Sequence, residues 1–180
     1  MIIEEKTIET ERIYEGKILN LRRDKVTAKS GTSYREIVEH NGGIVIIGIR
    51  PDGKIPMVRQ YRKAAEQAVL EIPAGKLERG EDPMEAAARE LKEETGYTAD
   101  KIKYLLGGYS SIGYSTEILK FYLAEGLTPG ETDFDDNEAI EIEAYTPDEL
   151  FGMAMRGELF DQKTIVAALL ARELVKASNL

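Results

Sequence analysis

The sequence predicts an α+β fold, an α-β-α sandwich preceded by an antiparallel β section. Strand-like and helix-like patterns alternate along the 180 residues, which favours helices layered on a sheet. Residues 42–49, GGIVIIGI, form a continuous apolar run suited to a strand buried on both faces. Two helical patterns close the chain, at 147–156 and 162–176, with Gly157 between them.

The other strands are predicted from short apolar segments bounded by turn residues. Residues 9–40 contain short strands around the turn at 29–32. The turn at 51–53, Pro-Asp-Gly, leads from the buried run into the next strand, at 55–61. Further strands are predicted at 103–109, 118–126 and 140–145.

A helix is predicted to begin at Pro83 and to end at Gly96. Asp82 is a favourable N-cap residue, proline suits the first helical position, and Glu85 stands where a capping-box glutamate is found. Glycine is the commonest residue just past a helix end. This helix therefore has start and stop signals of its own.

The composition limits the classes of function. The formal net charge of −9 disfavours nonspecific binding to nucleic acid. The absence of cysteine excludes disulfides, a thiol nucleophile and cysteine zinc sites. Because the sequence shows neither a secretory leader nor a membrane-spanning apolar run, we expect a cytoplasmic protein without a membrane partner.

Three glutamates on the predicted helix point to a metal. Glu90, Glu93 and Glu94 are spaced i, i+3 and i+4, which places them on one helix face. Their mutual repulsion destabilises the helix unless a cation neutralises it, and Mg²⁺ prefers carboxylate oxygens. The alternative is a solvated acidic face, the commoner meaning of clustered glutamates.

The surroundings of these glutamates resemble a known family. Gly75, Glu81 and residues 89–97, RELKEETGY, match the fixed positions of the Nudix box, so the chain resembles the Nudix hydrolases. The resemblance implies hydrolysis of a nucleoside diphosphate linked to another group, in an α-β-α sandwich. It also implies a divalent cation, Mg²⁺ or alternatively Mn²⁺ or another ion.

The resemblance assigns roles within the box. It implies that Glu90 and Glu94 are the principal metal ligands, with Glu93 a further ligand and the carbonyl of Ala74 a backbone contributor. Glu81 and Arg89 resemble a structural ion pair that orients the carboxylates. Gly75 supplies a backbone conformation or a close approach that a side chain would block.

Two segments outside the box resemble the ADP-ribose pyrophosphatase branch. Residues 58–62, VRQYR, precede LEIPAGKLERGE, and beside a diphosphate Arg62 becomes a phosphate clamp. The loop at 109–117 keeps the pattern of that branch but has Ile112 in place of a proline, which leaves the choice of nucleotide sugar open. Glu117 matches a substrate-contacting glutamate. As ordinary residues, Arg62 and Glu117 would simply be solvated at the surface.

An acidic loop is the expected source of the catalytic base. In the resembled enzymes a Glu-Asn-Glu loop folds over the metal, and here the triplet is Asp136-Asn137-Glu138. Glu138 aligns best with the carboxylate that reaches the site, Asp136 is one methylene shorter than expected, and Glu93 is the next candidate. Taken alone, an acidic loop is usually only solvated.

The function predicted from the resemblance is metal-dependent hydrolysis of ADP-ribose to AMP and ribose 5-phosphate. One alternative is a pyrophosphatase for another nucleoside diphosphate sugar, such as a GDP-hexose. The other is a noncatalytic nucleotide-binding module, which would have no chemical need for all three box glutamates.

The N-terminal section is expected to mediate assembly. Residues 1–40 hold too few strands for an independent core, so they pack on the catalytic domain, 41–180, or on a second copy. The resemblance implies a homodimer with exchanged N-terminal strands. Arg35 is then a candidate contact to the partner's substrate, and otherwise a surface residue paired with a neighbouring acid.

Overall fold

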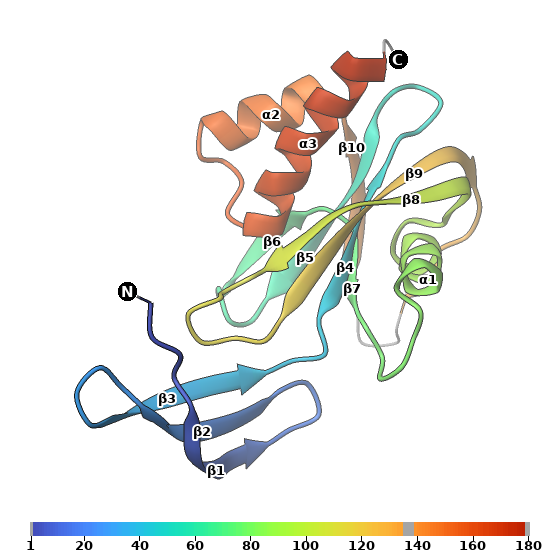
Figure 1. The fold of residues 1–180 in the computed structure, drawn as a ribbon. Coiled ribbons are helices and arrows are strands. Elements are labelled where there is room, and N and C mark those ends of the chain that lie inside the picture. Colours follow the sequence, from blue (N-terminus) through green and yellow to red (C-terminus); the bar gives the residue numbers. More distant parts are fainter. Residues whose placement is uncertain (1, 135–138, 179–180) are drawn as a thin grey trace. The chain divides into compact units, whose positions relative to one another are not determined.

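The computed structural model describes residues 2–134 and 139–178, which form two compact units. One unit comprises Met1–Gly42 and Gly108–Ile118, and the other comprises Gly43–Gly107 and Leu119–Leu180. The strands are β1 (Thr7–Glu15), β2 (Asn20–Thr27), β3 (Thr32–Glu39), β4 (Gly43–Gly48), β5 (Ile55–Arg62), β6 (Gln67–Glu71), β7 (Ala74–Lys76), β8 (Tyr97–Tyr109), β9 (Ile118–Pro129) and β10 (Ile140–Tyr145). The helices are α1 (Pro83–Thr95), α2 (Pro147–Met155) and α3 (Gln162–Ser178) (Figure 1).

The smaller unit is an antiparallel sheet in the order β1-β2-β3. The loop that joins β8 to β9 attaches to the edge of β3. There the N–H of Val38 donates to the carbonyl of Tyr114 at 2.8 Å, and the N–H of Thr116 donates to the carbonyl of Val38 at 2.9 Å. Every residue of β1 is exposed, so this sheet buries little apolar surface of its own.

The larger unit is built around β4, whose residues are all buried. Val45 and Ile47 face a core made with β5, β6, α2 and α3, whereas Ile44 and Ile46 face a second core made with α1. Side chains alternate between the faces of a strand, so a continuous apolar run serves both cores. Figure 1 shows α1 on one side of the sheets and α2 with α3 on the other. The predicted α-β-α sandwich is confirmed.

Two sheets form the middle of this unit. One has the order β10-β5-β6, and the other has the order β7-β4-β9-β8, with β4 and β9 parallel. The short strand β7 pairs with β4, placing Ala74 opposite Val45 and Gly75 opposite Ile44. Just before it, the carbonyl of Pro73 accepts from the N–H of Ile46 at 2.9 Å. The residues that precede α1 are therefore held against the most buried strand.

The ends of α1 follow the local sequence. The Asp82 side chain caps the helix by accepting from the N–H groups of Met84 and Glu85. Gly96 adopts the left-handed conformation, at φ 74°, and its N–H donates to the carbonyl of Lys92. A reciprocal capping box is formed at the start of α2, between Thr146 and Glu149, whereas the cap of α1 rests on the Asp82 side chain. Across the described ranges, no helix is both long and apolar enough to cross a membrane.

Candidate active site on the first helix

Gly75 lies directly against the carboxylate of Glu90. A Cβ atom at Gly75 would stand 1.8 Å from Cδ of Glu90 and 2.0 Å from Oε1, far inside contact distance. The close approach brings the β7 backbone and α1 together, and only glycine leaves room for the carboxylate between them. The glutamate side chain is consequently 14% exposed.

Arg89 joins the carboxylates of the helix to the preceding loop. Its Nε donates to Oε1 of Glu81 at 3.0 Å, and its Nη2 donates to Oε2 of the same residue at 3.3 Å. The remaining Nη1 donates to Glu90 at 2.9 Å and to Glu93 at 2.8 Å. One guanidinium thus binds a loop carboxylate and bridges two helix carboxylates.

Glu90 is a largely buried carboxyl group whose pKa is raised. Burial raises the pKa of this carboxyl group, and the neighbouring Arg89 guanidinium partly offsets the effect. By contrast, the hydrogen bonds from Arg89 hold the pKa of Glu81 below its ordinary value. A cation bound beside this buried carboxyl group would favour its ionised form.

Glu94 completes the carboxylate face of α1. Its Oε2 accepts from the N–H of Ala74 at 3.0 Å, so this side chain reaches back to β7 as Glu90 does. Within residues 2–134 and 139–178, no three acidic or histidine side chains form a ready-made metal cluster. Two of the box carboxylates, Glu90 and Glu93, instead bind Nη1 of Arg89. The donor set, the carboxylates of α1, fits a hard divalent cation.

Arg62, the candidate phosphate clamp, binds a carboxylate in the structure. Its Nε and Nη2 donate to the two oxygens of Glu71, at 2.6 Å and 2.9 Å. The arginine side chain is 46% exposed while that of Glu71 is 3% exposed. The guanidinium therefore extends from a buried anchor toward solvent.

Two candidate substrate residues lie in the smaller unit. Arg35 pairs with Glu5, donating from Nε to Oε2 at 2.8 Å, which matches its interpretation as a paired surface residue. Glu117 accepts from the hydroxyl of Ser110 at 2.6 Å. His40, the only histidine, accepts at Nδ1 from the N–H of Gly42 at 3.1 Å, a structural contact at the end of β3.

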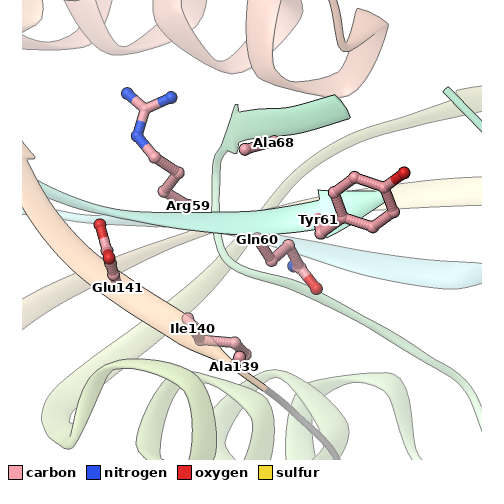
Figure 2. A pocket seen from close by; sticks show the side chains of 7 residues that line it. All are labelled: Arg59, Gln60, Tyr61, Ala68, Ala139, Ile140 and Glu141. Carbon is pink, nitrogen blue, oxygen red and sulfur yellow. The ribbon is translucent and has the colours of Figure 1, made fainter. Parts of the chain in front are cut away.

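The candidate bases Asp136 and Glu138 lie outside the described residues, but a pocket opens where the chain resumes. It has a volume of 260 Å³ and is lined by Arg59, Gln60, Tyr61, Ala68, Ala139, Ile140 and Glu141. Figure 2 shows Arg59 and Gln60 on opposite sides of β5, as strand alternation requires. Arg59 forms an ion pair with Glu143 of β10, the strand that pairs with β5, so its guanidinium already has a protein partner.

Sequence reasoning missed the partners of Arg62. Glu71 and Lys163 form an ion pair of 2.6 Å although they are 92 residues apart. The available signal was a glutamate within the apolar segment Val-Leu-Glu-Ile-Pro, because a charge in a buried strand requires a partner.

Comparison with known proteins agrees with this geometry. The family model described as the NUDIX domain matches residues 39–168. The chain is 43% identical to the methanol dehydrogenase activator of Bacillus methanolicus over 169 residues, covering 92% of this chain and 91% of that protein. It is 42% identical to the ADP-ribose pyrophosphatase of Bacillus subtilis over 168 residues, with coverage of 92% and 91%.

More distant similarities extend the comparison. The GDP-mannose pyrophosphatase of Yersinia enterocolitica is 32% identical over 150 residues, covering 76% of this chain and 78% of that protein. A solved structure described as an ADP compounds hydrolase superposes with a TM-score of 0.86 at 20% identity, covering 99% of this chain and 97% of the other. At that identity the superposition supports the fold alone.

Proposed function

Because the chain belongs to the Nudix family, we propose that it hydrolyses the diphosphate bond of ADP-ribose to AMP and ribose 5-phosphate. The observation that carries the proposal is the set of carboxylates on α1, packed against the backbone of β7 at Ala74 and Gly75. The similarity to an ADP-ribose pyrophosphatase supports the substrate. The similarity to a GDP-mannose pyrophosphatase supports the alternative, another nucleoside diphosphate sugar.

In this proposal Glu90, Glu94 and the carbonyl of Ala74 hold a divalent cation, Mg²⁺ or Mn²⁺, with Glu93 as a further ligand. When bound, the cation neutralises diphosphate charge and lowers the pKa of a coordinated water. Arg89, which is anchored to Glu81, keeps the carboxylates of Glu90 and Glu93 in place.

The other steps fall to residues outside the helix. Arg62 binds a diphosphate oxygen with the part of its guanidinium that Glu71 leaves exposed. Glu117 contacts the substrate from the loop after β8. A carboxylate of the 136–138 loop accepts the proton from the attacking water.

A panel of nucleoside diphosphate sugars with Mg²⁺ tests the function. Phosphatase is added after the reaction, so that phosphate released from AMP and ribose 5-phosphate reports hydrolysis. We expect ADP-ribose to give the highest kcat/KM. A higher value for a GDP-hexose would establish the alternative, and turnover of none would leave the noncatalytic module as the remaining class.

Amide substitutions can show which of the two loop carboxylates, Glu138 or Asp136, is the base. If Glu138 is the base, Glu138→Gln should lower kcat by about a hundredfold or more with little change in KM, because proton transfer occurs only in the catalytic step. Asp136→Asn should have the smaller effect. Asp133→Asn, an exposed residue just before the loop, is the matched control. Two amides that both retain full activity would move the base to Glu93.

We also propose a homodimer in which residues 1–40 exchange between copies and 41–180 form the catalytic domain. The support is the exposure of apolar side chains on β1, where Ile13 is 48% exposed and Tyr14 is 57% exposed. In the dimer Arg35 reaches the partner's substrate. The cytoplasmic location expected from the sequence stays a prediction, which cell fractionation would test.

A single charge on β1 tests the dimer. Light scattering of the full-length protein should give twice the mass of one chain, and Ile13→Lys should shift it toward the monomer with weaker substrate binding. Met155→Lys introduces the same charge at an exposed methionine of α2 and should change neither quantity. A monomeric wild-type protein that is fully active would refute the shared site.

A further inference from the structure

Glu71 is a buried carboxylate whose charge is balanced by two cations. It ends β6, is 3% exposed, and receives two hydrogen bonds from Arg62 and one from Lys163. Burial opposes its ionisation, but the two cations together hold the pKa of Glu71 below its ordinary value. Removing one partner of such a pair leaves part of a buried charge uncompensated, which is costly.

The second cation comes from the first turn of α3. Nζ of Lys163 lies 2.6 Å from Oε2 of Glu71 and 2.9 Å from Oδ2 of Asp161. Asp161 caps the helix by accepting from the backbone N–H of Thr164 at 3.1 Å. The hydroxyl of Thr164 accepts from the N–H of Ile72 at 2.9 Å. The start of α3 is thus joined to Glu71, at the end of β6, by an ion pair, and to the next residue, Ile72, by a hydrogen bond.

This junction lies next to the candidate active site in the chain. Glu71 and Ile72 lead through Pro73 to Ala74, whose N–H binds Glu94 at 3.0 Å. The pKa of Arg62 is raised mainly by Glu71. The negative charge of Glu94, on α1, adds to this effect. The junction therefore connects α3 to both Arg62 and the carboxylate face of α1.

The contacts of Arg62 leave one edge of its guanidinium available. Nε and Nη2 bind Glu71, whereas Nη1 makes no hydrogen bond to any residue that the structure describes. Oε2 of Glu71 is shared between Arg62 and Lys163, so the arginine does not have to compensate the buried charge alone. The lysine is 15% exposed, which keeps its own ammonium group largely away from solvent.

We propose that Lys163 is a positioning residue for diphosphate binding, which shares Glu71 with Arg62 and so directs Nη1 of the arginine to a diphosphate oxygen. The inference rests on the proposed function, because it requires a diphosphate substrate. Without the lysine, Arg62 alone compensates the buried charge of Glu71, which then holds the guanidinium more tightly to itself and away from the diphosphate. Substrate binding then weakens although the lysine itself touches no substrate atom.

The test compares Lys163→Met with the wild type. Isothermal titration with ADP-ribose in EDTA, where hydrolysis stops, measures Kd, and assays with Mg²⁺ measure KM and kcat. We expect Kd and KM to rise about tenfold in Lys163→Met, with kcat changed less than about threefold. Lys163→Arg should recover most of the affinity. Lys176→Met is the matched control, because Lys176 is an exposed lysine in the last turn of the same helix.

A double-mutant cycle with Arg62→Met separates positioning from a general charge effect. If Lys163 acts through Arg62, Lys163→Met should raise KM by less than about twofold in the Arg62→Met background. Additive effects, or wild-type KM in Lys163→Met, would overturn the inference. If thermal melting shows that Lys163→Met does not fold, Lys163→Gln, which retains a donor for Glu71, replaces it in the cycle.

The two proposals fail in different ways. A wild-type protein that hydrolyses no nucleotide diphosphate overturns the proposed function and this inference with it. An active wild type whose Lys163 variants bind ADP-ribose normally overturns the inference alone. Where another nucleotide sugar proves the better substrate, the same cycle is measured with that compound.

Discussion

Replacing Glu94 by glutamine is expected to lower kcat/KM by about a hundredfold or more, since a ligand's charge supports roughly 3 kcal/mol of transition-state stabilisation through the cation. Glutamine retains a side-chain oxygen that can accept from the N–H of Ala74, as Glu94 does at 3.0 Å. The fold should therefore survive, and a melting curve would show this. The activity measurement is kcat/KM for ADP-ribose, determined from the dependence of the rate on substrate at each of a series of Mg²⁺ concentrations.

Glu85→Gln provides the matched control for this substitution. Glu85 lies on the same helix, in its exposed first turn, and loses the same charge. Its removal should cost only a few tenths of a kcal/mol in helix stability and leave turnover unchanged. Glu94→Gln with wild-type turnover at every Mg²⁺ concentration would show that α1 is not the metal site.

The parts of the fold that could be predicted from sequence depend on local chemistry. The start of α1 follows from a capping side chain, and its end follows from a glycine that adopts φ 74°. The burial of β4 follows from a run without polar residues. In each case the residues that determine the element lie within or beside it.

The contacts around Arg62 could not be predicted in this way. The sequence places a suitable arginine before the box, but its partner Glu71 and the lysine that shares it depend on how α3 packs on β6. The helix periodicity of α3 does not specify which strand its first turn will meet. Similarly, the spacing of Glu90 and Glu93 gives a common face, whereas the bridge through Nη1 of Arg89 depends on a side-chain rotamer.

Gly75→Ala is expected to abolish most activity with little loss of stability. The added Cβ would lie 1.8 Å from Cδ of Glu90, which is the movable end of a long side chain. The glutamate can rotate away at a modest cost of about 1 kcal/mol for an altered rotamer, so the protein folds. Its carboxylate then no longer faces the cation, and kcat/KM should fall about a hundredfold or more.

Metal binding separates this displacement from a general disturbance of the fold. In the wild type Mn²⁺ should raise the melting temperature, because a ligand that binds only the folded state stabilises it, and Gly75→Ala should lose most of that increase. Gly108→Ala is the control, since a Cβ there meets no atom within 4 Å. If Gly75→Ala kept both its Mn²⁺ response and its turnover, the position of the Glu90 carboxylate against β7 would have no part in catalysis.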